Sequence, residues 1–137
     1  EYYQAEAAVT NGRASLRFGQ EVLSGDAARP ERRFQTPLAS LHLFQGWADK
    51  FLVTPAQGLR DTYVLAGYKR KTWEVTAWWH DFRAEAASRR YGRECDVSVA
   101  YRSRSKHEWL LKYADYRTRG FASDTRKIWL QYAREFR

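Results

Sequence analysis

Hydrophobic and polar residues alternate with a period of two along most of this chain. The alternation is clearest in the segment 93–102, where Val97 and Val99 would point to one side and Glu94 and Asp96 to the other. Strict alternation is typical of a β-strand with one apolar and one polar face. Seven segments of this kind predict seven strands, at 2–10, 13–23, 62–69, 72–82, 93–102, 107–117 and 126–136.

Short and long connections alternate between these segments. The short connections, "TNGR", "KRK" and "SRSK", fit tight hairpins, whereas the segment 24–61 and the stretches containing "AEAASRRYG" and "TRGFASDT" are longer. An antiparallel sheet connected in this way has all its tight turns at one end and all its long loops at the other. Outer-membrane β-barrels show the same asymmetry.

Aromatic residues gather on the apolar face at its short-turn end. On each of the last five predicted strands, the apolar-face residue nearest the short turns is aromatic, and these residues are Tyr68, Trp73, Tyr101, Trp109 and Phe136. Aromatic rings are enriched at the two water interfaces of a membrane. We therefore predict that these five residues form a membrane-interface girdle.

The whole chain, 1–137, is predicted to be one portion of an antiparallel transmembrane β-barrel. A transmembrane helix requires about 18 apolar residues, which no run approaches, but a transmembrane strand needs only about 9 to 11 and half of them can be polar. In this interpretation Leu16, Trp73 and Val97 face lipid. A soluble β-sandwich or lipocalin-like barrel has the same alternation with its apolar face inward, and alternation alone does not decide between them.

The polar face would line a water-filled lumen. Charges in such a lumen set ion selectivity through the local field, although any wide polar barrel also needs a hydrogen-bonded lining. The predicted pore-lining residues are Arg17, Glu21, Glu74, Glu94, Asp96, Arg102, Lys112 and Lys127.

The long connection at 24–61 contains too many large apolar residues for a solvated coil. Leu41, Ala48, Phe51 and Leu52 recur at near-helical spacing, which favours a short amphipathic helix. Loops of this length in compact proteins are usually functional. We predict that this outer loop folds toward the pore and narrows it, with constriction residues His42, Phe44, Trp47, Asp49 and Lys50.

Several blocks of sequence resemble a known family. The stretch "FQTPLASLHLFQGWADKFLVTPAQGLRD", followed by "AWWHDF", "YGRECD" and "KIWLQYAREF", is similar to the C-terminal part of the alginate export family of bacterial outer-membrane proteins. The resemblance implies a large monomeric β-barrel in the Gram-negative outer membrane, of which this chain would be the closing portion. It also implies a channel that passes anionic or polar solutes passively, including exported polysaccharide.

The partners expected from this interpretation are membrane components. A last strand ending in an aromatic residue, here Phe136 before Arg137, resembles the signal read by the barrel assembly machinery. Loop arginines such as Arg89 and Arg90 would contact lipopolysaccharide phosphates or attract anionic solutes. The first residue is Glu1, without a Met or a secretion signal, so we expect a processed chain or a piece of a longer one.

Other functional classes find little support in the sequence. The net charge of +8 is scattered through the alternating segments and not collected in one stripe, so nucleic-acid binding is not expected. Cys95 is the single cysteine, which excludes an internal disulfide and a thiolate metal cluster. His80 and Asp81 are adjacent in a strand and must point to opposite faces. With no phosphate-cradling glycine pattern and no nucleophile elbow, we expect no enzyme activity, metal or cofactor.

Overall fold

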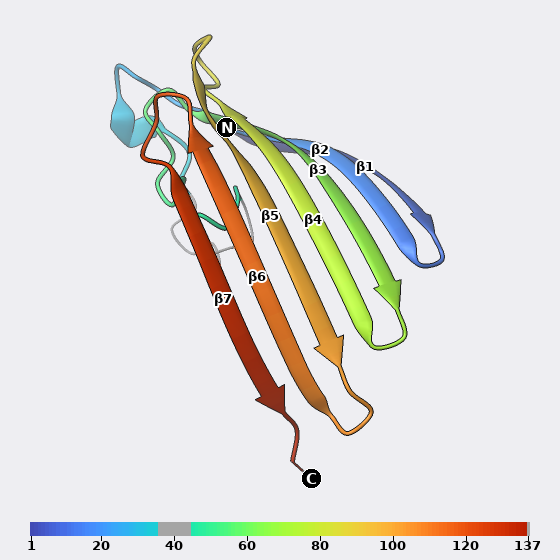
Figure 1. Cartoon of the computed structure of the whole chain (residues 1–137). Helices are drawn as coiled ribbons and strands as arrows, with labels where there is room; N and C mark the ends of the chain where they lie inside the picture. The colour runs from blue at the N-terminus through green and yellow to red at the C-terminus, as the bar shows by residue number, and fades with distance from the viewer. Residues whose placement is uncertain (36–44, 137) are drawn as a thin grey trace.

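Seven antiparallel strands form a single sheet in which every strand lies beside its neighbours in sequence (Figure 1). The structure, a computed structural model, describes residues 1–35 and 45–136. The predicted all-β antiparallel sheet is confirmed. The strands are β1 (Tyr2–Asn11), β2 (Ala14–Leu23), β3 (Leu59–Arg70), β4 (Trp73–Arg83), β5 (Arg90–Arg102), β6 (His107–Thr118) and β7 (Thr125–Arg134), and a 3-10 helix, η1, spans Pro30–Arg32.

The sheet is curved and open, since β1 and β7 lie at its two edges (Figure 1). Its three short turns lie together at one end and its long connections at the other, as the sequence predicted. Each short turn contains one residue with a left-handed backbone, namely Gly12, Lys71 or Lys106. No helix among the described residues is both long and apolar enough to span a bilayer.

The apolar face of the sheet is exposed over much of its area. Side chains from different strands stand in register across it, as in the row that runs from Leu16 through Ala66 and Ala77 to Val97. The exposed fraction is 55% for Leu16, 39% for Val97 and 70% for Leu130. Residues of this face are therefore not packed together in a dry interior of the described chain.

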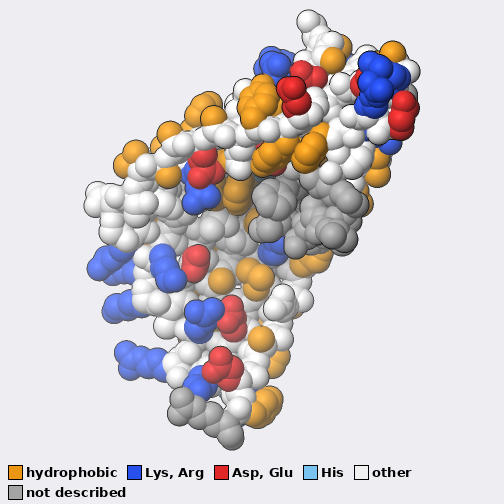
Figure 2. Space-filling model, turned by 180° about the vertical axis from the view of Figure 1, so that it is seen from behind, with side chains coloured by type: hydrophobic (Ala, Val, Ile, Leu, Met, Phe, Trp, Pro, Cys, Tyr) orange, Lys and Arg blue, Asp and Glu red, His pale blue; other side chains and the backbone are white. Residues whose placement is uncertain are grey.

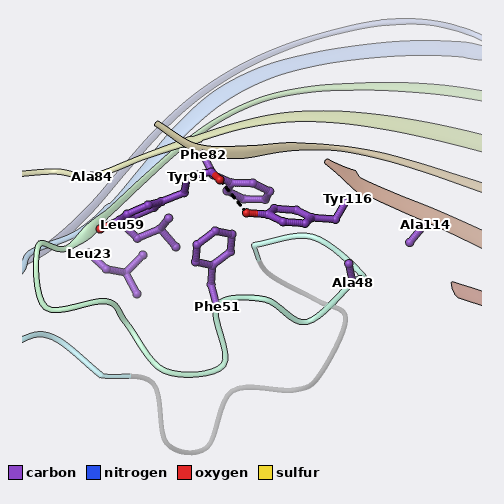
Figure 3. Close-up of a cluster of buried hydrophobic side chains, with 9 residues drawn as sticks. All are labelled: Leu23, Ala48, Phe51, Leu59, Phe82, Ala84, Tyr91, Ala114 and Tyr116. Atoms are coloured by element: carbon purple, nitrogen blue, oxygen red, sulfur yellow. Dashed lines mark hydrogen bonds between the residues drawn. The ribbon is translucent and has the colours of Figure 1, made fainter. Parts of the chain in front are cut away.

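A small hydrophobic core lies on the opposite face, at the long-loop end. Phe51, from the connection between β2 and β3, points toward the sheet and contacts Phe82, Tyr91 and Tyr116 (Figure 3). The ring centroid of Phe51 lies 4.5 Å from that of Phe82 and 5.2 Å from the stacked ring of Phe121. The face predicted to be polar thus carries an apolar patch where Phe51 packs on it.

The described part of the long connection is irregular. Residues 45–58 form turns and bends, so the predicted helix is not found at Ala48, Phe51 or Leu52, while its earlier positions lie outside the described residues. Backbone hydrogen bonds fix the last part of this connection, because the amides of Glu85 and Ala86 both donate to the carbonyl of Gln57 at 3.0 Å. An irregular segment therefore has a defined place against the sheet.

The connection between β6 and β7 is closed by an aspartate. The backbone N–H of Thr118 donates to Oδ1 of Asp124 at 2.8 Å, and this hydrogen bond holds the pKa of the Asp124 carboxyl below its usual value. The hydroxyl of Tyr116 donates to the carbonyl of Phe121 at 2.9 Å. Both contacts keep Phe121 over the core.

Replacing Phe51 by alanine tests the importance of this core. Phe51→Ala leaves a cavity among aromatic rings and should lower the free energy of unfolding by about 3 to 5 kcal/mol, the usual range for a buried phenylalanine. The neighbouring Leu52 is 57% exposed, so Leu52→Ala should cost less than about 1 kcal/mol. Urea denaturation of both variants under the same conditions measures the difference. Equal destabilisation would show that the loop does not pack as described.

Candidate functional site

The candidate site is the polar face beneath the loop segment Gln45–Phe51, which we call the anchored loop. Strands β2, β5, β6 and β7 present charged side chains toward it because their inward positions alternate with the apolar ones. Asp96 and Lys127 stand in one cross-strand row, joined through Ala114. The register of the sheet thus brings residues that are far apart in sequence under one loop.

Three buried carboxylates hold the anchored loop from below. The backbone N–H of Ala48 donates to Oε1 of Glu94 at 2.6 Å, and that of Trp47 donates to Oδ2 of Asp96 at 3.1 Å. The side-chain amide of Gln45 donates to Oε2 of Glu21 at 2.7 Å. These hydrogen bonds satisfy loop donors that are shielded from water and would be costly to leave without an acceptor. The carboxylates therefore fix the path of the loop.

Gly46 makes the close approach possible. Its backbone φ is +81°, and a Cβ at this position would lie 2.6 Å from Oε2 of Glu94. A residue with a side chain would therefore be strained in its backbone and would clash with the carboxylate. The glycine in "FQGWADKF" is explained by this contact.

Two lysines hold the other side of the anchored loop. Nζ of Lys127 donates to Oδ2 of Asp49 at 2.6 Å. Nζ of Lys112 lies 4.1 Å from the ring centroid of Trp47 and 5.4 Å from that of Trp129, which is close enough for cation–π attraction. The anchored loop is thus held by acidic side chains of β2 and β5 on one side and by lysines of β6 and β7 on the other.

His80 also lies on the polar face, and its side chain is only 4% exposed. Its Nδ1 is 2.8 Å from Oδ2 of Asp61, and its ring stacks on that of Trp78 with the two planes 5° apart. Asp81 instead contacts Arg83 and Arg93 on the apolar side. The prediction that His80 and Asp81 point to opposite faces is confirmed.

A cleft of about 270 Å³ opens beside the anchored loop, over β1 to β4. Tyr63 lies on its wall, where its hydroxyl donates to Oε2 of Glu6 at 2.7 Å and accepts from Nε2 of Gln4 at 2.9 Å. Arg17 also contacts Glu6, at 3.3 Å between Nε and Oε1. Aromatic faces beside amide, carboxylate and guanidinium groups can bind a hydroxylated solute.

The short-turn end of the polar face carries paired charges. Lys69 contacts Glu74 at 3.4 Å, and Arg102 contacts Glu108 at 3.0 Å. In the lower part of the view in Figure 2, acidic and basic side chains lie close together. Exposed pairs of this kind contribute little to stability, but they give the face a polar surface that faces water.

The structure places all eight predicted pore-lining residues on one face, but their exposure differs. Glu21, Glu94 and Asp96 are buried beneath the anchored loop, with exposed fractions of 4%, 1% and 0%. Their contacts are with the loop, so they support it. The predicted residues that retain more exposure are Arg17, Glu74, Arg102, Lys112 and Lys127.

Three of the five predicted constriction residues lie in the described part of the chain. Trp47, Asp49 and Lys50 belong to the anchored loop, and Nζ of Lys50 lies 5.8 Å from the ring centroid of Tyr116. His42 and Phe44 lie outside the described residues. The described residues of this set therefore rest on the polar face, where the sequence placed the lumen.

Four of the five predicted girdle residues lie in strands, on the apolar side at its short-turn end, and these are Tyr68, Trp73, Tyr101 and Trp109. The ring centroids of Trp73 and Tyr101 are 4.8 Å apart, and Trp109 packs at 4.6 Å against Tyr132, which the prediction did not include. Phe136 lies beyond the end of β7 and not within the strand as predicted. It is 79% exposed, with the guanidinium of Arg134 at 4.9 Å from its ring centroid.

Sequence reasoning missed three contributors to the site: Asp61, Tyr63 and Gln45. Asp61 was left out because strand 3 was predicted to begin at residue 62, whereas β3 begins at Leu59. Extending the alternation back by one residue would have placed Asp61 on the polar face. Gln45 makes its contact from an irregular segment, and alternation gives no signal there.

Comparisons with known proteins add no assignment, because no family model, no curated protein and no solved structure matches this chain. Within residues 1–35 and 45–136, no group of three or more His, Cys, Asp or Glu side chains is arranged to hold a metal ion.

Hydrogen exchange at the anchored loop tests the carboxylate contacts. In Glu94→Ala the amide of Ala48 loses its acceptor, so its exchange should accelerate by about tenfold to a hundredfold, which corresponds to roughly 1 to 3 kcal/mol. Glu74→Ala is the matched control, because Glu74 lies on the same face and contacts Lys69 instead of the loop. Acceleration at Ala48 by the control variant, or none in Glu94→Ala, would contradict the anchoring role.

Proposed function

We propose that this chain forms part of the wall of an outer-membrane β-barrel channel of the alginate-export type. In this proposal the apolar face contacts lipid and the polar face lines the lumen. The observation that carries it is the contrast between the two faces: Leu16, Ile128 and Leu130 are largely exposed, whereas the polar face is covered at its loop end by the anchored loop.

The extent of the apolar surface supports lipid contact. Two neighbouring cross-strand rows contain no charged residue, and large apolar patches are rare on soluble monomers. Charges begin on this side one row nearer the long loops, at Asp115 and Arg126, and one row nearer the short turns, at Arg70. A lysine or arginine costs about 2 to 4 kcal/mol at the bilayer midplane and about 0 to 1 near the interfaces, which fits this distribution. The first row is Val9, Leu16, Ala66, Ala77, Val97, Tyr113 and Ile128, and the second is Asn11, Ala14, Tyr68, Val75, Val99, Leu111 and Leu130.

The open edges of the sheet support a larger barrel. Edge strands β1 and β7 each have ten residues and pair with one neighbour. Backbone groups facing hydrocarbon must be hydrogen-bonded, so a spanning sheet has to be closed. We propose that further strands of the same protein close it.

The proposed transport is passive passage of anionic or polar solutes, including polysaccharide, through a lumen narrowed by the anchored loop. Arg17 and Lys112 lie on the lumen side with partial exposure and would act on a passing solute through their charge. The proposed partners are outer-membrane lipid, lipopolysaccharide and the barrel assembly machinery. Catalysis, a metal and a cofactor form no part of the proposal.

A soluble β-barrel or β-sandwich binding module is the second candidate. The small core around Phe51 favours it, because it shows that this sheet can cover apolar residues with its own loop. In that case a second layer of protein would have to cover the exposed face that bears Val97 and Leu130. A third candidate is a membrane barrel that has a structural role and transports nothing.

Fractionation distinguishes the membrane proposal from the soluble module. Expressed in a Gram-negative host with an export signal, the chain within its full barrel should sediment with outer membranes, resist carbonate extraction and dissolve only in detergent. The apolar surface bearing Ile128 and Leu130 is the physical reason. Recovery of folded protein from the aqueous fraction would rule out the channel.

Single-channel recording tests the constriction. Deleting residues 45–52 from the full barrel removes the part of the loop that rests on the polar face and should raise the conductance in planar bilayers. Deleting Ala27 and Ala28, which are exposed and belong to the same connection outside the anchored loop, is the control and should leave conductance near the original value. Unchanged conductance in the first variant would exclude the constriction, while no conductance from any form would favour the structural barrel.

A further inference from the structure

Three arginines stand side by side where β3, β4 and β5 meet the long loops. Arg60 is the register partner of Arg83, and Arg83 is the register partner of Arg90. Like charges placed directly opposite one another on a sheet are destabilising, so this row requires an explanation. A bulge between Phe82 and Arg83 shifts the register at this point. Bulges are common beside functional sites, where they redirect side chains.

The row borders an open cleft of about 570 Å³. Its lining includes a fourth arginine, Arg89, and a single acid, Glu85. The connection that forms one wall is fixed by backbone hydrogen bonds, since the amide of Ala84 donates to the carbonyl of Arg89 at 2.8 Å. A cationic cleft with a fixed wall is suited to an anion.

The guanidinium groups of the row keep hydrogen-bonding capacity that the described residues do not satisfy. Nε of Arg60 is buried and has no hydrogen-bond partner among the described residues. Arg83 contacts Asp81, but that carboxylate is shared with Arg93. Arginine presents a planar fork of donors that matches the oxygens of a phosphate or a carboxylate in a bidentate way, and a cluster of arginines favours phosphate because of its higher negative charge.

The position of the row indicates what carries the phosphate. Arg60 points to the apolar side of the sheet, because it has the same alternation as Val64 on β3. At about 3.3 Å per residue, Val64 lies roughly 13 Å along the strand from Arg60. A phosphate bound by the arginines would therefore sit beyond the apolar surface, and a hydrocarbon chain attached to it could lie along that surface.

We propose that Arg60, Arg83 and Arg90 bind the phosphate headgroup of an amphiphile whose hydrocarbon part covers the apolar face. The class of ligand is a phosphorylated lipid of the membrane leaflet at the long-loop end. Phosphate recognition rests on the arginine row alone, and the lipid source rests on the proposed function.

Phosphorus NMR on the chain within its full barrel, in dodecyl maltoside micelles, tests the site. Dodecyl phosphate is titrated into the micelles, and its signal should broaden and shift as it binds. The double variant Arg60→Gln/Arg90→Gln should weaken binding by about tenfold or more, the effect expected from losing a charge-assisted contact. Arg13→Gln/Lys71→Gln removes two cations from the short turns at the opposite end and should bind like the original chain.

Each alternative gives a different result. Equal weakening by the control variant would show non-specific charge attraction, and equal binding of dodecanoate would show that phosphate is not selected. Equal affinity for inorganic phosphate would assign a free anion and exclude the lipid. Arg60→Lys keeps the charge but not the planar fork, so a folded Arg60→Lys with full binding would also overturn the site. If a chain recovered in the aqueous fraction bound dodecyl phosphate, the channel would be excluded, whereas the arginine site would be supported.

Discussion

Successive side chains of a β-strand point to opposite sides, and this constraint determines the rest of the molecule. A sheet with Val97 and Leu130 on one side and Glu94 and Lys127 on the other cannot place both sides in the same environment. The loop between β2 and β3 rests on the charged side, because that side supplies acceptors for its backbone amides. The apolar side remains exposed in the described chain.

The anchored loop shows how an irregular segment can be fixed without a helix. Its donors reach buried carboxylates, Asp49 reaches Lys127, and Phe51 enters the small core. These contacts come from five strands, β2 and β4 to β7, so the loop position depends on the register of the sheet. A glycine at position 46 is required because the loop backbone lies so close to Glu94.

Much of the sheet could be predicted from the sequence, because strand alternation is a local signal. The seven strands, the short and long connections and the shared face of residues such as Arg17, Asp96 and Lys112 all follow from it. The contacts of Gln45 and the burial of Glu94 could not be predicted, because they depend on a loop that folds back over distant strands. Asp61 was missed through an error of three residues in the start of one strand. The resemblance to the alginate export family remains a prediction.

The most direct test of the account is a measurement of which side of β5 contacts hydrocarbon. A nitroxide label can be attached to Val97→Cys or to its neighbour Ser98→Cys in a full barrel that carries Cys95→Ala and lies in lipid vesicles. We predict that the label at position 97 collides mainly with oxygen dissolved in the bilayer and the label at position 98 with a water-soluble nickel complex. The reverse order, or water access at both positions, would contradict the central claim that the apolar face of this sheet contacts lipid.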